Sequence, residues 1–161
     1  MNRLLISIVV ATCLTAAPAF AKRLGNVEKG YSFEVPDDWK ITNADFLIKA
    51  PDGTVLTEIA YPKNGTPTPE LASGVATGTV KALLRLTEEG GQTAASGKAW
   101  RGLQRFFIDT AGRRVVQLVC ETPNGISLFY LQVPMDQWKV KESELLTVIR
   151  SVEFAPVRSG E

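Results

Sequence analysis

The chain has 161 residues, of which 45% are hydrophobic and 22% are charged, and these proportions are typical of one globular domain with a single core. Lysine and arginine number 18 and aspartate and glutamate 17, so the chain lacks the basic excess that binds nucleic acid or anionic membrane surfaces. It contains no histidine, which removes the usual general base at neutral pH and the commonest ligand of catalytic metals. We therefore expect no nucleic-acid partner, no cofactor and no metal site.

The first 21 residues have the three parts of a secretory signal peptide. Arg3 provides the positive start, residues 4–14 form an apolar run, and residues 19–21 (Ala-Phe-Ala) are typical of a cleavage site. The apolar run is shorter than the roughly 20 residues of a membrane-spanning helix, which disfavours an uncleaved anchor. Thr12 before Cys13 disfavours a lipoprotein leader, since Gly, Ala or Ser normally precedes a lipidated cysteine. We expect a secreted protein, periplasmic in a Gram-negative source, without stable membrane insertion after cleavage.

Cleavage leaves 140 residues with 17 basic and 17 acidic side chains. We expect a polar lead-in over residues 22–29, a single domain over residues 30–154 and a frayed tail over residues 155–161. Cys120 is then the one remaining cysteine, so no intramolecular disulfide can form and the fold must rest on packing. Its apolar strand neighbours favour a buried, inert thiol over a reactive one.

The first part of the domain has the pattern of strands. Apolar and polar residues alternate over residues 31–35, which predicts a half-buried strand that ends in the turn 36–38. Residues 39–42 continue as an extended stretch, and residues 46–50 and 54–61 predict a hairpin around Pro-Asp-Gly. The apolar residues that we expect on one face of its second strand are Val55, Ile59 and Tyr61.

A long helix is predicted from Thr68 to the pair Gly90-Gly91. Thr68 can cap it, Pro69 suits the first helical position, and Glu70 lies near the positive end of the helix dipole. An apolar stripe follows at helical spacing, made of Leu71, Val75, Ala82 or Leu83, and Leu86.

The second half of the chain predicts a meander of strands and a short last helix. The expected strands span residues 92–99, 102–109, 113–121 and 126–133, and the Asn-Gly pair at 124–125 is a strong hairpin signal. Residues 134–138 are interpreted as a connector, and a helix is predicted to begin near Ser143 with Leu145, Val148, Ile149 and Val152 on its apolar stripe. The whole order of elements predicts an α+β fold, a central antiparallel β-sheet with helices packed on its faces.

Partner contacts are hypothesised at three tryptophans and one loop. Trp39, Trp100 and Trp138 all lie at boundaries of predicted elements, and tryptophan is enriched at interfaces; packing at the rim of the core is the alternative. Lys63 and Asn64 belong to a proline-rich loop, and loops on a rigid scaffold often carry function.

Two charged pairs have simpler interpretations than a binding site. Asp37-Asp38 could bind a cation, but adjacent carboxylates between strands are typical of a turn. Arg113-Arg114 follows a hairpin turn and is interpreted as a solvated strand edge.

The segment Tyr31-Ser32-Phe33-Glu34-Val35-Pro36-Asp37-Asp38-Trp39 resembles the strand, Pro-x-x-Trp opening of PsbP-like and DcrB-like proteins. The order of elements after it is similar to that family over about residues 30–154, down to the ending Ser151-Val152-Glu153-Phe154. The resemblance implies a PsbP-like sandwich. It also implies a mostly non-catalytic binder, since such relatives include extrinsic photosystem II subunits, a nuclear-import adaptor, periplasmic proteins and secretion chaperones. It carries over no catalytic residue.

The sequence thus predicts a secreted, non-enzymatic binding or accessory domain, whose partner is a protein or another envelope component. The alternative is a cell-envelope hydrolase that uses carboxylates or a Ser/Lys pair, because such chemistry needs no histidine. Two buried carboxyls roughly 5 to 9 Å apart in one groove would favour the hydrolase.

Overall fold

The computed structural model describes residues 22–26, 30–42, 48–62, 68–70, 72, 74, 78, 85–98, 100–122 and 125–155. The strands are β1 (Lys22–Asn26), β2 (Tyr31–Val35), β3 (Lys40–Ile41), β4 (Ile48–Lys49), β5 (Val55–Pro62), β6 (Thr87–Ser96), β7 (Arg101–Ile108), β8 (Arg114–Thr122), β9 (Gly125–Val133) and β10 (Glu153–Phe154). Helix α2 spans Met135–Arg150.

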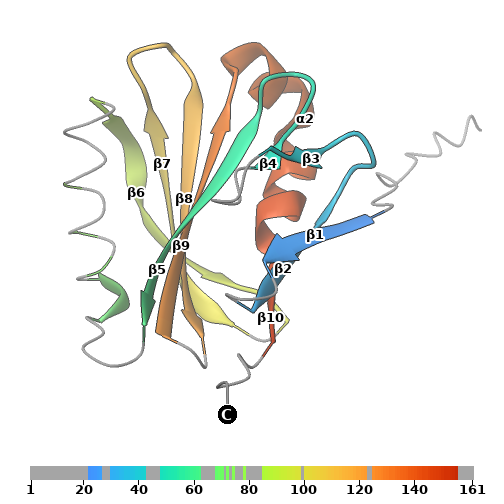
Figure 1. Ribbon diagram of the computed structural model, residues 1–161. Coiled ribbons are helices and arrows are strands. Elements are labelled where there is room, and N and C mark those ends of the chain that lie inside the picture. The colour runs from blue at the N-terminus through green and yellow to red at the C-terminus, as the bar shows by residue number, and fades with distance from the viewer. Residues whose placement is uncertain are drawn as a thin grey trace, which may run out of the picture.

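These strands form two antiparallel sheets. The large sheet has the order β3-β4-β5-β9-β8-β7-β6, and the small sheet has the order β1-β2-β10 (Figure 1). Helix α2 and the small sheet pack into one core against the same face of the large sheet. The predicted α+β class with a central antiparallel sheet is therefore correct, and α2 is a helix that covers one face.

The predicted hairpins are present. Strand β4 pairs with β5, and β8 pairs with β9 up to Thr122 opposite Gly125. Val55 and Ile59 lie on one side of β5, as expected, and the side chain of Tyr61 is outside the described part of the structure. Leu56, on the other side, is the residue that enters the core beneath α2, whereas Ile59 is partly exposed.

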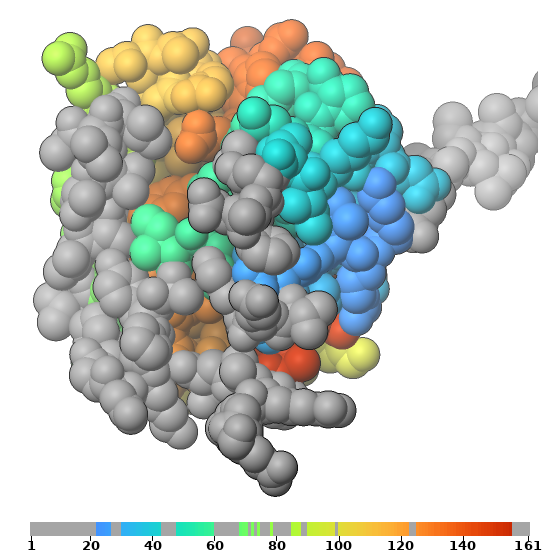
Figure 2. Space-filling view, in the orientation of Figure 1, coloured from blue at the N-terminus to red at the C-terminus, as the bar shows by residue number. Residues whose placement is uncertain are grey.

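The polar lead-in was wrong as a description of residues 22–26, because these residues form β1. Strand β1 pairs with β2 over five positions, and Arg23 joins Glu34 at 2.8 Å and Glu153 at 2.6 Å. Figure 2 shows β1 on the surface beside β3. The segment has little apolar pattern of its own, so its structure comes from pairing with β2, the next strand along the chain. The predicted leader and residues 156–161 lie outside the described residues.

The predicted end of the long helix was also wrong. Residues 69, 70, 72, 74 and 78 are helical, as expected, but Gly90 and Gly91 lie inside β6. Gly90 has a φ of +75°, and the register of β6 on β7 shifts between Glu89 and Thr93. The two glycines therefore lie at a β-bulge, where Gly90 adopts a positive φ that glycine accepts without steric cost. The rest of the predicted helix lies outside the described residues.

Helix α2 begins eight residues before the predicted start at Ser143. The connector interpretation of residues 134–138 was wrong, because Pro134 precedes the first turn and its carbonyl accepts the Trp138 amide at 2.9 Å. Asp136 places a negative charge in that turn, where the helix dipole favours it. The predicted apolar stripe is confirmed for Leu145, Val148 and Ile149, which are buried, whereas Val152 is buried but follows the end of the helix.

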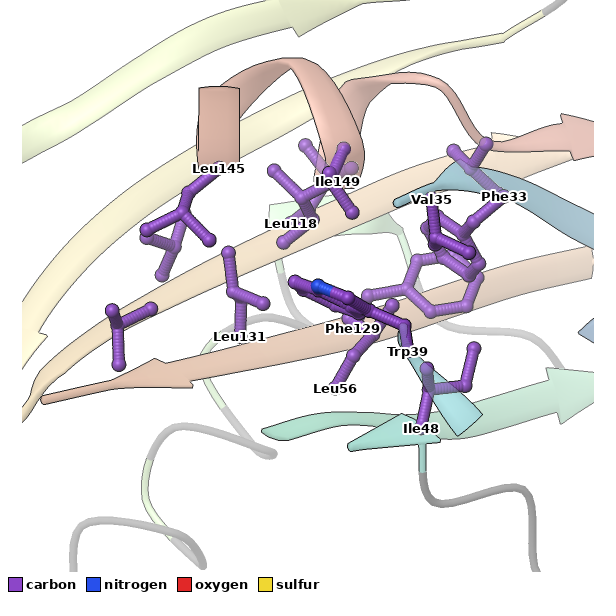
Figure 3. Packing of buried hydrophobic residues seen from close by; sticks show 14 of the residues in the cluster. Phe33, Val35, Trp39, Ile48, Leu56, Leu118, Phe129, Leu131, Leu145 and Ile149 are labelled. Atoms are coloured by element: carbon purple, nitrogen blue, oxygen red, sulfur yellow. The ribbon is translucent and has the colours of Figure 1, made fainter. Parts of the chain in front are cut away.

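The core beneath α2 consists of residues from both sheets and the helix. In Figure 3, Leu145 and Ile149 point from α2 toward Leu118 and Leu131 of the large sheet. The opposite face of the large sheet is buried as well, and Ala72 from the helical segment packs there beside Phe107 and Leu128. Among the described residues, no helix has the length and apolar character needed to cross a bilayer.

A turn and α2 are joined by one partly buried ion pair. Lys141 Nζ lies 3.0 Å from Asp52 Oδ2, while Asp52 Oδ1 accepts the Thr54 amide at 2.9 Å. Burial alone raises the pKa of Asp52, but the hydrogen bonds from Thr54 and Lys141 outweigh burial and lower the pKa below its usual value. The charged carboxylate therefore stabilises the folded state.

We predict that Ile149→Ala lowers the free energy of unfolding by about 2 to 5 kcal/mol, because the side chain is fully buried and its loss leaves a cavity. Val140→Ala on the same helix is the control, since Val140 is 81% exposed, and should change stability by less than about 0.5 kcal/mol. Urea unfolding measures both. Equal effects of the two substitutions would contradict the assigned packing of α2.

We predict that Lys141→Met makes the protein more sensitive to acid. The pKa of Asp52 is lowered on folding, so its contribution is complete above the ordinary carboxyl pKa and is lost as pH falls through the lower folded value. Removing Lys141 raises the folded pKa, so the acid-unfolding midpoint moves to higher pH. Circular dichroism against pH measures the midpoint, and Lys139→Met on the exposed helix surface is the control. An unchanged midpoint in Lys141→Met would refute the role of the pair.

Candidate functional site

A cleft of about 850 Å³ lies where β6 ends and β7 begins. It is lined by residues 68–70, 94–96 and 101–103, together with Glu121 and Arg150. Pockets that bind small molecules commonly enclose about 300 to 1,000 Å³. The cleft therefore has the size of a binding site.

Small residues make the strand wall of the cleft. Ala94, Ala95 and Ser96 end β6, and Gly102 packs so close to β8 that a Cβ would lie 1.7 Å from the Val119 carbonyl oxygen. A side chain at position 102 would therefore push the strands apart. The short side chains of these residues leave the space of the cleft open above the strands.

The turn between β6 and β7 is fixed by Trp100. The Gly97 amide donates to the Trp100 carbonyl at 3.0 Å, and the indole Nε1 donates to the Val152 carbonyl at 2.9 Å. A Cβ at Gly97 would lie 2.1 Å from the indole nitrogen, so the turn needs glycine there. The buried indole thus ties the rim of the cleft to the chain after α2.

Two arginines line the cleft and differ in their partners. Arg101 Nε donates to Glu121 Oε2 at 2.8 Å, and this bond raises the pKa of Arg101 above its usual value. Arg150 instead donates from Nε and Nη2 to Oε1 of Gln104, at 3.0 and 2.8 Å. Gln104 is 2% exposed, so a buried neutral amide orients an exposed cation.

Sequence reasoning missed both members of this pair. Gln104 lies among apolar residues in a strand, where a polar residue is usually interpreted as solvent-facing. Arg150 ends a helix, where a positive charge is expected to favour the helix dipole. The two positions are 46 residues apart, so no local pattern joins them.

The tryptophans hypothesised as contacts are all in the core. Trp39, Trp100 and Trp138 are 4%, 6% and 5% exposed, and they belong to the same cluster as α2. The alternative interpretation, packing at element boundaries, describes their positions. Lys63 and Asn64 lie outside the described residues.

The acidic pair lies in the turn predicted for it, whereas the basic pair does not lie at a sheet edge. Asp37 and Asp38 are exposed in the predicted turn, which Trp39 closes by donating its amide to the Pro36 carbonyl. The interpretation of Arg113 and Arg114 as a solvated edge was wrong, because β8 is a central strand.

Each of these two arginines has a specific partner in the structure. Arg113 donates to Asp109 at 2.7 Å. The guanidinium carbon of Arg114 lies 5.5 Å from the Trp138 ring centroid and 5.8 Å from that of Phe106. Such cation–π contacts add to the packing of the core.

The carboxylates of the cleft do not match the arrangement expected of a hydrolase. Glu70 and Glu121 are both exposed, and Glu121 is paired with Arg101. The buried Asp109 accepts bonds from the Ala111 amide and Arg113, so it has a structural role in a turn. No three acidic or cysteine residues of the described ranges gather as metal ligands.

Two further buried groups are built into the core. Burial and the nearby Glu58 raise the pKa of the Tyr31 hydroxyl, which hydrogen-bonds that carboxylate. Cys120 is buried, as predicted, and burial raises the pKa of its thiol.

Comparison with known proteins found solved structures with a similar fold. No family model and no curated protein matches the sequence. The solution structure of cyanobacterial PsbP from Synechocystis superposes with a TM-score of 0.63 at 17% identity, covering 91% of this chain and 99% of that one. The crystal structure of LpqN from Mycobacterium tuberculosis, a protein involved in cell envelope biogenesis, has a TM-score of 0.54 at 18% identity, covering 84% and 90%. The predicted resemblance is thus confirmed at the level of architecture, and the chain has the PsbP-like fold.

Proposed function

We propose that this protein is an extracytoplasmic accessory domain that acts by binding a component of the cell envelope and not by catalysis. The fold shared with LpqN, a protein of envelope biogenesis, supports the envelope assignment. The leader pattern supports export, and the residue after its predicted cleavage site, Lys22, is already part of β1. In a Gram-negative source the compartment would be the periplasm.

The observation that carries the binding role is the composition of the cleft. Its strand wall is made of small residues, and its charged groups are exposed arginines and glutamates. A catalytic acid or base needs a pKa near the working pH, which burial or a like-charged neighbour produces. The cleft carboxylates are exposed, whereas an oriented cation in a cleft favours recognition.

The cleft also lies on a rigid part of the scaffold. Strand β7 is paired along its full length with β8, and Trp100 fixes the turn that precedes it. A preformed surface binds with less loss of conformational entropy than a mobile one. We therefore assign the partner contact to this end of the sheet.

We predict that a photoreactive side chain at Ser96, on the rim of the cleft, forms an adduct with an envelope component in cells of the source organism. The same group at Val140, exposed on α2, should form none. Mass spectrometry of the fractionated envelope identifies the adduct, and also shows whether the protein has lost residues 1–21.

A competition experiment with unlabelled protein shows whether the adduct forms at the cleft. Excess unlabelled protein should suppress the Ser96 adduct, whereas the Ala94→Arg variant, which fills the cleft at an exposed position, should not. Retention of the full chain in the cytoplasm would refute the proposal. Identical adducts from Ser96 and Val140 would refute the place of the contact.

A further inference from the structure

We propose that Arg150 receives an oxyanion, a carboxylate or a phosphate group, of the ligand that enters the cleft. The proposal rests on the proposed binding function, since it names the chemical group that the cleft recognises. Arg150 lines the 850 Å³ cleft and also a neighbouring groove of about 460 Å³ between α2 and β2. Its guanidinium is therefore next to open space on two sides.

The hydrogen bonds of Arg150 leave a defined set of donors. A guanidinium has five N–H groups in a planar fork. The Nε and Nη2 groups on one edge donate to the single oxygen of Gln104, at 3.0 and 2.8 Å. The end formed by Nη1 and the second N–H of Nη2 has no partner among the described residues. This end has the geometry that grips two oxygens of a carboxylate or phosphate.

The charge of Arg150 is not compensated by an acid. No carboxylate of the described ranges lies within ion-pair distance of it, whereas Arg23, Arg101 and Arg113 each pair with one. The Gln104 amide fixes the direction of the guanidinium and leaves its positive charge intact. An acidic partner in the same place would fix the direction and cancel the charge.

Both ends of the pair are attached to rigid structure. Gln104 is in the middle of β7, opposite Leu118 of β8, and its side chain is almost fully buried. Arg150 directly follows Ile149, a fully buried residue of α2. The entropy cost of ordering a long side chain is thus met on folding, which leaves more of the interaction energy for the ligand.

The helix dipole explains part of this arrangement but not its orientation. A positive charge in the last turn of α2 is favourable for any arginine or lysine rotamer. The helix dipole does not require a buried glutamine that accepts two N–H hydrogen bonds from the guanidinium. The bidentate contact with Gln104 is the feature that prepares the free end for a ligand.

The chain offers a matched control in Arg105. Its Nε and Nη2 donate to Oε1 of Gln92 at 3.1 and 2.7 Å, the same pattern of bonds. Gln92 is exposed on the edge strand, and Arg105 lines neither the cleft nor the groove. A substitution there removes an equal charge without touching the proposed site.

The test titrates the protein with inorganic phosphate and with acetate, and uses chloride at equal ionic strength as the reference. NMR shifts of backbone amides in β7 and the last turn of α2 report binding. We expect a saturable shift with phosphate or acetate and none with chloride, and the oxyanion that saturates at the lower concentration identifies the group. Arg150→Gln should weaken this binding about tenfold or more, and Arg105→Gln should leave it unchanged.

Two more variants separate charge from orientation. Arg150→Lys keeps the charge but lacks the fork, so binding should weaken with the fold intact. Gln104→Glu supplies a carboxylate partner, which should abolish binding if the free charge is essential. The thermal midpoint of each variant confirms folding.

The outcomes also separate this proposal from the proposed function. Equal oxyanion binding by wild type and Arg150→Gln, or no preference over chloride, would overturn the role of Arg150 while a Ser96 adduct still supported envelope binding. Saturable, Arg150-dependent oxyanion binding without any Ser96 adduct would retain the site and refute the envelope assignment.

Discussion

The contact of Phe129 with Tyr31 and Phe33 is the interaction on which the arrangement of the molecule depends. The ring centroids lie 5.2 and 4.9 Å apart in edge-to-face geometry, and they join the small sheet to the large one. Strand β2, which carries Tyr31 and Phe33, is also the strand with which both β1 and β10 pair. This contact therefore anchors the central strand of the small sheet to the large sheet.

The same region continues directly to the cleft. After α2 the chain passes through Val152, whose carbonyl accepts the Trp100 indole, and then enters β10 beside β2. Trp100 fixes the turn at the start of β7, and Gln104 lies four residues further along that strand. The core thus helps to set the position of Gln104, the residue that orients the Arg150 guanidinium. Binding at this site would use a geometry that folding has already fixed.

Local sequence patterns were sufficient for the elements that are governed by local physics. The alternation over residues 31–35 and the Asn-Gly signal at 124–125 gave correct strands and a correct hairpin, because side-chain period and turn chemistry are properties of adjacent residues. Elements whose structure depends on pairing with another strand were misread. Strand β1 has little pattern without β2, and the glycines of β6 are typical of a helix end until their pairing with β7 is known.

The candidate site was harder to predict than the fold for the same reason. The tryptophans were hypothesised as partner contacts because they are large aromatic residues at element boundaries, but tertiary packing buries all three. Gln104 and Arg150 are 46 residues apart in sequence, and their relation arises when the fold brings the end of α2 within hydrogen-bond distance of β7. A resemblance over about residues 30–154 did predict the architecture, because the fold is retained at 17% and 18% sequence identity.

In the proposed site, the Arg150 side chain is rigid and is already positioned before a ligand binds. Nitrogen relaxation of the arginine Nε–H groups in the free protein tests this claim most directly, with Arg101, which is 82% exposed and paired with an exposed glutamate, as the reference. We predict that the Nε–H group of Arg150 has an order parameter of about 0.85, the value typical of rigid backbone, and that Arg101 has a lower one. An Arg150 order parameter below about 0.6, equal to that of Arg101, would contradict a preformed site.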